Sequence, residues 1–389
     1  MISVAEAEQR IVAALAPLPA ETVALEQAAG RVLAADVRAV LDQPPAAVSA
    51  MDGYAVRAAD SGPRKVIGAA PAGHPFAGHV GPGEAVRIFT GGVVPDGADA
   101  IAIQEDTRAE GDSVSFNEMP QAGRSIRPRG QDFRQGEVLA AAGRRLAPRD
   151  LALLAAGDIS KVAVRRRPLV AFAATGDELS RPGQKRRDGG ITASSGYGLS
   201  PLIAGWGGVP RDLGILPDTS EAIASIAPLA GDADLIVTLG GASVGDHDLV
   251  RTIPGIALDF WKIAMRPGKP LIFGKLGATP LLGLPGNPVS SLVTALLFLR
   301  PAIATMLGTD TAQPLRRARL AAPLAANDSR QDYLRANTAW RDGECWVRAN
   351  PRQDSAMLKI FAQSDALIIR APNAPALEAG APVDFIPLE

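Results

Sequence analysis

The sequence has almost none of the side chains that build most thiol, zinc and redox sites. Its 389 residues include one cysteine, Cys345, and three histidines, His74, His79 and His247. One cysteine excludes an internal disulfide and any zinc cluster built on several thiolates. With so few imidazoles, a structural zinc site is not expected either.

Aromatic residues are scarce, and neither sign of charge is in excess. Aromatics make up 4% of the chain, too few to predict a surface on which bases of single-stranded nucleic acid stack. Lysine and arginine number 40 against 41 acidic residues, so the net charge of −1 creates no field that attracts nucleic acid or an anionic membrane. We expect no nucleic-acid partner, and any anion site must be local.

A long hydrophobic run is also missing. The most apolar stretch, Leu292 to Leu299, is followed by Arg300 and Pro301, well short of the ~20 residues that a membrane span needs. Glu6 and Glu8 precede any apolar run, which does not fit a signal peptide. We therefore expect a buried helix here, no membrane partner, and a soluble cytoplasmic protein.

What is present predicts several domains of the α/β class. The length suits two to four domains, and 47% hydrophobic residues suffice for substantial cores. The pattern of apolar runs and Gly/Pro turns changes along the chain and predicts four domains. They are a helical domain from residues 1–44 and 137–165, an inserted β-rich domain at 45–136, an α/β domain at 166–310, and a small C-terminal β domain at 311–389.

The helical domain is expected to hold helices over residues 3–16, 25–35 and 148–156, the first of them capped by Ser3. In the α/β domain, apolar strands alternate with glycine-rich loops and helices, which predicts a parallel sheet. The expected strands are 168–174, 235–239, 271–273 and 280–284, and the expected helices are 195–206, 220–229 and 288–299.

A polar, glycine-rich loop follows the C-terminal end of three of these strands, at residues 175–178, 240–248 and 285–291. A fourth such segment spans residues 266–270. Ligands of open parallel sheets bind at the carboxyl ends of the strands. In the third loop, Asn287 suits an N-cap and Pro288 the first helical position, so Ser290 would lie in a first turn that favours anions. An ordinary capped helix has the same pattern.

Carboxylates and cations occupy the other loops. Ser243 lies near Asp246 and Asp248, and two carboxylates two residues apart suit Mg²⁺, although a solvated acidic turn would look alike. Asp177 and Glu178 leave the same two alternatives open.

A cluster of three cations stands within eight positions, at Lys262, Arg266 and Lys269. Lys269 is held between Gly268 and Pro270, a rigid backbone suited to an anion clamp, whereas the alternative is a solvated run of charges. The four loops together predict phosphoryl or nucleotide chemistry, or transfer of another oxyanion, assisted by Mg²⁺. No Walker-type loop and no G-x-G-x-x-G after the first strand is present, which argues against common NTPases and dinucleotide dehydrogenases.

Seven motifs, in this order, resemble those of the molybdopterin molybdenumtransferases, the MoeA type that also forms the E domain of gephyrin. They are SAMDGYAV at 49–56, FTGG at 89–92, RGQD at 129–132, TGDEL at 175–179, GGASVGDHD at 240–248, RPGKP at 266–270 and LPGNPVS at 284–290. The resemblance implies an elongated, L-shaped homodimer with an inserted β domain, a molybdopterin-binding α/β domain, a C-terminal β-barrel, and an active site shared between subunits.

The resemblance also implies a reaction: molybdate reacts with adenylylated molybdopterin, AMP is released, and molybdenum stays on the dithiolene, with Mg²⁺ assisting. Two alternatives remain open, a molybdopterin adenylyltransferase and a non-catalytic scaffold of the gephyrin type. Expected partners, besides the small-molecule substrates and a second subunit, are a molybdopterin adenylyltransferase and proteins that assemble molybdoenzymes.

Site roles carry over by motif. Catalytic roles are implied for Asp52, Thr90, Asp132, Glu178 and Asp248, and metal binding for Asp246 and Asp248. Binding of the substrates is implied for Thr175, Gly176, Asp177, Gly240, Gly241, Ser243, Lys262, Arg266, Lys269, Pro285, Gly286, Asn287, Pro288, Ser290, Arg335 and Ser355.

The sequence departs from the family pattern in three places. Ala193-Ser194-Ser195 stands where the family commonly has Asp-Ser-Asn, so a contact to the pterin or nucleotide is in question there. Arg266 replaces a lysine, which keeps the charge but not the geometry. Ala242 replaces a valine.

Overall fold

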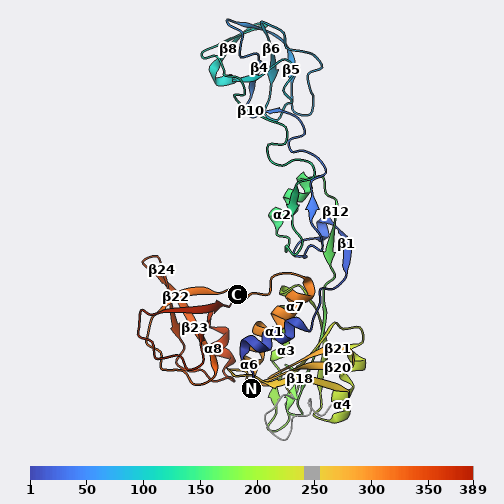
Figure 1. The fold of residues 1–389 in the computed structure, drawn as a ribbon, viewed down its shortest axis with the longest axis vertical. Coiled ribbons are helices and arrows are strands. Elements are labelled where there is room, and N and C mark those ends of the chain that lie inside the picture. Colours follow the sequence, from blue (N-terminus) through green and yellow to red (C-terminus); the bar gives the residue numbers. More distant parts are fainter. Residues whose placement is uncertain (241–254, 389) are drawn as a thin grey trace. The chain divides into compact units, whose positions relative to one another are not determined.

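The computed structural model describes residues 1–240 and 255–388 (Figure 1). The chain forms two compact units. Unit 1 consists of Met1–Glu21 and Arg165–Glu389, and unit 2 of Thr22–Val164.

The largest sheet of unit 2 among the described residues has six strands in the order β7-β4-β6-β5-β9-β8 (Figure 1). Neighbouring residues of one strand, such as Ala55 and Val56, are both fully buried and belong to different apolar clusters. Because successive side chains point to opposite faces, the sheet is packed on both faces. Its strands are β4 (Gly53–Val56), β5 (Arg64–Ala70), β6 (Glu84–Ile88), β7 (Ala100–Ile103), β8 (Thr107–Glu110) and β9 (Ser113–Phe116), with η2 (Gln104–Asp106) between β7 and β8.

The rest of unit 2 is built on helix α2 (Pro148–Ala156), which confirms the helix expected there. The helix expected at 25–35 is wrong: only the 3₁₀ turn η1 (Leu25–Gln27) forms. Gly30 adopts a φ of +71°, which ends the helical path, and Ala34 N then donates to Ala163 O as extended backbone. Short strands complete this part: β1 (Ala20–Ala24) with β12 (Lys161–Arg165), β2 (Val37–Arg38) with β11 (Val138–Ala140), and β3 (Val48–Ser49) with β10 (Ile126–Arg127).

Unit 1 contains a second six-stranded sheet, in the order β16-β13-β17-β21-β20-β18. The first four strands are parallel, as predicted, but β20 and β18 run antiparallel at one edge. Gly277 and Ala278 alone connect β20 to β21, and so short a link only permits an antiparallel pair. The strands are β13 (Leu169–Thr175), β16 (Val209–Leu216), β17 (Leu235–Leu239), β18 (Ile256–Lys262), β20 (Pro270–Leu276) and β21 (Thr279–Leu284), and the small strands β14 (Leu179–Ser180) and β15 (Ile191–Thr192) form a separate pair.

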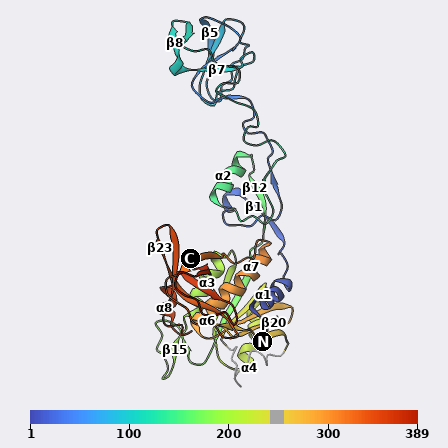
Figure 2. The same cartoon turned by 60° about the vertical axis from the view of Figure 1, so that its left-hand side comes forward.

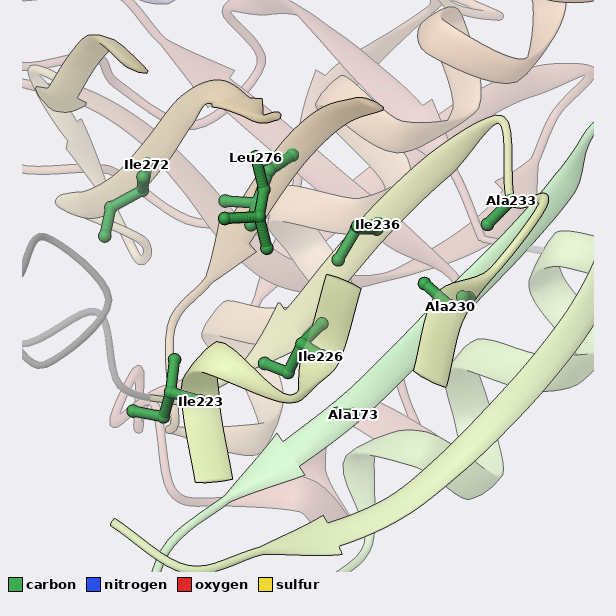
Figure 3. Packing of buried hydrophobic residues seen from close by; sticks show 10 residues of the cluster. Ala173, Ile223, Ile226, Ala230, Ala233, Ile236, Ile272 and Leu276 are labelled. Atoms are coloured by element: carbon green, nitrogen blue, oxygen red, sulfur yellow. The ribbon is translucent and has the colours of Figure 1, made fainter. Parts of the chain in front are cut away.

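One face of this sheet is covered by two short helices, where a single helix was expected at 220–229. Helix α4 (Ser220–Ala224) ends and α5 (Ile226–Ala230) begins around Ser225, because Pro228 has no N–H to donate to Ala224. Figure 3 shows Ile223 and Ile226 from these helices packed toward Ile236 of β17, in a core that also holds Ile272 and Leu276 of β20.

Helix α3 (Ser195–Gly205), as expected, packs against strands β13 and β16 of the sheet. Helix α1 (Val4–Ala13), whose Ser3 cap accepts from Glu6 N at 3.1 Å, packs against α7 (Arg300–Leu307). The helix expected to end at Leu299 continues to Leu307. It runs through α6 (Pro288–Thr294), the π-helical turn η4 (Ala295–Leu299) and α7 (Arg300–Leu307). By length and composition this one helix of the described residues could cross a membrane, but 78% of its apolar window is buried inside the fold, as in a core helix.

The side chain of Gln313 supports this helix where Pro301 interrupts its backbone hydrogen bonds. Proline has no N–H for the carbonyl four residues back, Leu297 O, which would otherwise be left without its helical partner. The Gln313 Nε2 donates to Leu297 O and to Leu296 O, both at 3.3 Å, and Arg300 Nη2 donates to Gln313 Oε1 at 2.9 Å. The side-chain amide therefore replaces the missing backbone donor.

The C-terminal part of unit 1 is a closed β-barrel, which confirms the predicted architecture (Figures 1 and 2). Five strands pair in the ring β23-β24-β22-β26-β25, and β25 closes it by pairing with β23. The strands are β22 (Arg316–Leu320), β23 (Gln331–Arg341), β24 (Glu344–Ala349), β25 (Ala366–Arg370) and β26 (Pro382–Pro387); β19 (Met265–Arg266) adds to β23 from outside the ring, and helix α8 (Leu358–Ala362) lies between β24 and β25 in the chain.

We predict that Gln313→Leu destabilises unit 1 by about 1–3 kcal/mol, because it leaves a buried helix carbonyl without a donor. The measurement is the urea midpoint followed by tryptophan fluorescence, with the denaturant slope checked for constancy. Gln9→Leu, the same change on the exposed side of α1, is the control. Equal midpoints for the two variants would contradict the role of Gln313.

Candidate anion site at the strand ends of unit 1

Three loops of the sheet meet at Gly240. A Cβ at this position would lie 2.8 Å from Thr175 O and 3.2 Å from Thr175 Oγ1, and φ is +98°, so only glycine fits. Gly240 N donates to Leu284 O at 3.1 Å, and a Cβ on Gly286 would lie 3.6 Å from Gly240 Cα. The ends of β13, β17 and β21 thus form one continuous surface, and Thr175 Oγ1 is buried there without a hydrogen-bond partner among the described residues.

The acidic residues after β13 are exposed at the same sheet edge. The Glu178 carboxylate folds back over Gly176, and Asp177 Oδ1 accepts from Asp218 N at 3.4 Å. Neither carboxylate has an ion pair within the described ranges, so both face solvent or a ligand.

The loop after β21 reaches the C-terminal barrel. Asn287 occupies the N-cap position of α6, but its side chain does not cap the helix as expected. Its Nδ2 donates instead to Ser355 Oγ at 3.1 Å, and Val289 N donates to Ser355 O at 3.1 Å. Ser290 and Ser291 follow in the buried first turn, and the Ser291 hydroxyl has no hydrogen-bond partner in the described part of the chain.

Arg335 of β23 is a buried cation next to this contact. Its side chain is among the largest fully buried ones, with a residue exposure of 2%. Nη2 donates to Asp354 O at 3.3 Å, directly before Ser355, and no carboxylate within the described residues forms an ion pair with it. Desolvation by burial lowers the pKa of Arg335 from its ordinary value, and the charges of Asp354 and Asp332 oppose this shift in part. A guanidinium buried without an ion pair is costly unless an anion joins it.

The segment 266–270 packs against the same helix. Gly268, at a φ of +112°, lies in contact with the Thr294 methyl group of α6. Lys269 therefore directly follows a residue that packs against the helix carrying Ser290. Lys269 is half-buried, and its ammonium group has no ion pair in the ranges described.

The other two cations of the cluster have partners within the chain. Arg266 Nε donates to Asp332 Oδ1 at 2.9 Å, and its Nη2 donates to the second oxygen of this buried carboxylate. Arg266 also pairs with Asp328 at 3.4 Å. Lys262 Nζ lies 3.5 Å from the centroid of the Trp261 ring. Of the three predicted cations, Lys269 is therefore the one left free for a ligand among the described residues.

Unit 2 positions a separate pair of predicted site residues. Asp52 precedes β4 and Thr90 follows β6, and these strands are neighbours in the sheet. Asp52 Oδ1 accepts from Thr90 N at 2.7 Å and from Thr90 Oγ1 at 2.8 Å, and these two bonds lower the pKa of Asp52. Asp132 is exposed and donates its backbone N–H to Gln43 O at 2.9 Å, with no hydrogen bond to Asp52 in the described part of the molecule.

Two residues near these sites were not predicted. Asp332 was missed because an acidic residue inside a strand gives no local signal of its partner. Arg87 stacks between the rings of Tyr54 and Phe89, at 5.0 and 4.9 Å from their centroids, and its charge also lowers the pKa of Asp52. In a chain with 4% aromatics, two rings close to the Asp52 and Thr90 motifs were an available signal.

The predicted metal residues lie outside the described part. Gly241, Ser243, Asp246 and Asp248 fall in 241–254, together with the Ala242 substitution. Among residues 1–240 and 255–388, no three His, Cys, Asp or Glu side chains gather as a metal site would require.

The fold is that of a multidomain α/β protein with a closed C-terminal barrel, and comparison with known proteins gives the family. Three family models match: the MoeA N-terminal region (domain I and II) over residues 2–157, a probable molybdopterin binding domain over 171–305, and the MoeA C-terminal region (domain IV) over 317–388. The chain belongs to the MoeA family of molybdopterin molybdenumtransferases.

Known members of this family are similar to the chain over most of its length. It is 37% identical to the molybdopterin molybdenumtransferase of Haemophilus influenzae over 79% of this chain and 78% of that protein, and 35% identical to that of Nostoc sp. over 90% and 84%. A solved structure of the molybdopterin biosynthesis MoeA protein from Pyrococcus horikoshii is 27% identical, covers 100% of both chains and superposes with a TM-score of 0.88.

We predict that Thr90→Val raises the pKa of Asp52, because it removes one of the two hydrogen bonds that stabilise the carboxylate. The pKa stays below the ordinary value, since the bond from the backbone N–H of residue 90 remains. A ¹³C NMR titration of the Asp52 carboxyl measures the change. Thr107→Val, which only removes a hydroxyl bonded to Gln104 O, is the control and leaves the titration of Asp52 unchanged. An unchanged titration in Thr90→Val would show that the hydroxyl does not act on Asp52.

Proposed function

We propose that this protein transfers molybdenum from molybdate to adenylylated molybdopterin and releases AMP, in the biosynthesis of the molybdenum cofactor. The observation that carries the proposal is Arg335, a buried guanidinium without a carboxylate partner in the described residues. It adjoins Ser355 and Asn287, at the end of a sheet whose glycine-rich loops resemble those of the family.

Molybdate suits this environment chemically. It is a tetrahedral dianion, and charge-assisted bonds from Arg335 and Lys269 would bind it more strongly than neutral donors do. Ser290 and Ser355 supply hydroxyl groups on the segments that carry or adjoin these cations. Binding the dianion would offset part of the cost of burying the Arg335 guanidinium without an ion pair.

The remaining predicted residues would take further roles in the same reaction. The glycine-rich strand ends would hold the pterin and its phosphate, because backbone N–H groups can approach them closely there. The acidic side chains Asp52, Asp132 and Glu178 would act in releasing the adenylate. Substrate-binding positions in these loops are Thr175, Gly176, Asp177, Gly240, Pro285, Gly286 and Pro288.

We also propose, from the sequence, that the reaction depends on Mg²⁺. Asp246 and Asp248 stand two residues apart, and Mg²⁺ prefers a few carboxylates together with phosphate oxygens. When bound, the ion would neutralise charge on the phosphate that leaves with the adenylate.

The two alternatives are less well supported. An adenylyltransferase would resemble the α/β domain alone, whereas family models match the N-terminal and C-terminal regions of this chain as well. A pure scaffold would not require a guanidinium that is buried without an ion pair among the described residues. We also infer a cytoplasmic enzyme with the four domains expected from the sequence, at 1–44 with 137–165, 45–136, 166–310 and 311–389.

The test is single-turnover molybdenum insertion with adenylylated molybdopterin, molybdate and Mg²⁺, read as AMP release and metal-loaded cofactor. Arg335→Gln should weaken molybdate binding by about 10- to 150-fold, the range for losing one charge-assisted bond. Arg341→Gln, a change on the exposed end of the same strand, is the control. Wild-type protein that releases no AMP under these conditions refutes the proposed function, and unchanged molybdate binding in Arg335→Gln refutes the role of Arg335.

We extend the proposal to a homodimer in which Asp52 of one subunit and Lys269 of the other serve one active site, as the family resemblance implies. Mixing the variants Asp52→Ala and Lys269→Ala, each inactive alone, tests it. Random exchange makes about half the dimers hybrids, each with one intact and one doubly damaged site, so about a quarter of the sites should recover. Verified exchange without recovered activity would exclude a shared site.

A further inference from the structure

Arg87 of strand β6 lies between the two motifs of unit 2 that carry Asp52 and Thr90. Across the sheet it is paired with Tyr54 of β4, two residues after Asp52. Phe89 comes two residues after Arg87 and directly before Thr90. Side chains that lie opposite each other in an antiparallel pair share one face of the sheet, and so do side chains two positions apart on a strand. Arg87 therefore meets one aromatic ring from each motif.

The guanidinium of Arg87 is held by both rings and by two hydrogen bonds. Its Cζ lies 5.0 Å from the centroid of the Tyr54 ring and 4.9 Å from that of the Phe89 ring, distances at which a cation is attracted to an aromatic face. Nη1 donates to Gly53 O at 3.0 Å, and Nη2 donates to Gln104 Oε1 at 2.8 Å. Neither acceptor is charged, and no carboxylate forms an ion pair with Arg87 within residues 1–240 and 255–388. Its positive charge is therefore fixed in place but not paired.

Both hydrogen bonds of this guanidinium end next to Asp52. Gly53 is the following residue, and Gln104 N donates to Asp52 O at 3.0 Å. A Cβ on Gly53 would lie 2.0 Å from Ala102 O, so the backbone after Asp52 lies directly against strand β7 and only glycine fits there. Arg87 is therefore bonded to the two residues that fix the Asp52 backbone.

The carboxylate of Asp52 keeps one oxygen free in this arrangement. Oδ1 accepts both bonds from Thr90, whereas Oδ2 accepts none in the described part of the chain. The bonds from Thr90 lower the pKa of this carboxyl, desolvation opposes them, and the charge of Arg87 lowers the pKa further. Oδ2 therefore belongs to an ionised group whose orientation depends on how the Asp52 turn and the Thr90 loop lie relative to each other.

We infer that Arg87 is a positioning residue for the transfer reaction: it holds the Asp52 turn and the Thr90 loop together, so that the Asp52 carboxylate presents one free oxygen in a fixed orientation. Its bond to Gly53 O and its contact with the Phe89 ring tie both motifs to one planar group. A lysine could not replace it, because an ammonium has neither a flat face for two rings nor a fork of donors for two acceptors. The inference rests on the proposed function, in which Asp52 acts in releasing the adenylate.

Two variants of the full chain separate the charge of Arg87 from its geometry. Arg87→Met removes the charge and both donors but keeps a long side chain, and Arg87→Lys keeps the charge alone. A ¹³C NMR titration follows the Asp52 carboxyl, and steady-state release of AMP gives kcat and the KM for molybdate. The Tyr54 phenol and Glu105, which accepts from Gln104 Nε2 at 3.5 Å, are the other titratable groups in contact with this set among the described residues, and they are the same in every variant.

Arg87→Met should raise the pKa of Asp52, because a positive charge that stabilises the carboxylate is lost. It should also lower kcat for AMP release by about 10- to 100-fold, the cost of misplacing a reacting group, with the KM for molybdate unchanged. Arg87→Lys should leave the titration near that of the wild type and still lower kcat. Arg108→Met, on the edge strand β8 of the same sheet, is the matched control, since it breaks an exposed ion pair with Glu110 and should change neither measurement.

Phe89→Leu provides a second measurement in case Arg87→Met does not fold, as judged by circular dichroism. The Phe89 ring is exposed, so its loss leaves the core of the sheet intact. The substitution removes one of the two rings that hold the guanidinium, whereas the charge of Arg87 remains. It should therefore leave the titration of Asp52 unchanged and lower kcat by about two- to fivefold.

The outcomes distinguish this inference from the proposed function. Wild-type protein that releases no AMP refutes the proposed function and the inference with it. If wild-type protein is active, a folded Arg87→Met variant with the wild-type titration or the wild-type kcat overturns the inference alone. A raised KM for molybdate in that variant overturns it as well, because a residue that acts through Asp52 does not bind the anion. Where Arg87→Met does not fold, a wild-type kcat in both Phe89→Leu and Arg87→Lys overturns it.

Discussion

The ion pair between Arg266 and Asp332 is the interaction on which the arrangement of the anion site depends. It joins the loop that carries Lys269 to the barrel strand that carries Arg335, three residues further along in each case. The parallel pairing of β19 with β23 runs beside it, so the two segments are fixed in register. A buried carboxylate held by a two-pronged guanidinium is directional, which sets the orientation as well as the distance.

A second set of contacts joins the barrel to the helix α6 that carries Ser290. Ser355 of the barrel accepts from Asn287 and Val289 at the start of α6, and Gly268 packs against that helix from the loop side. The glycines at the strand ends bring the backbone of three loops together at this edge. The result is a site assembled from parts of unit 1 that lie far apart in sequence, in which a buried guanidinium is left without a carboxylate of its own among the described residues.

Glycine also shapes the pockets beside β13 and β16. A Cβ on Gly196 would lie 3.2 Å from Phe172 Cε2, and a Cβ on Gly214 would lie 3.2 Å from Arg181 Nη2. The strand ends therefore offer two kinds of surface: cations and hydroxyls near the barrel, and pockets walled in part by Arg181 and Arg187 beside β16.

Local signals in the sequence determined the elements and most of the candidate loops. Apolar runs that end in glycine-rich loops marked the ends of β13, β17 and β21, because strand period, turn residues and caps act over a few positions. The same local reasoning failed at Gly30, Pro228 and Pro301, where backbone geometry or a distant donor decided the outcome. Only the tertiary structure decided that Arg266 serves Asp332, that Asn287 reaches Ser355, and that Arg335 is buried. The two contacts join residues 66 and 68 positions apart. The burial of a charge is a property of everything packed around it, which no stretch of the chain encodes alone.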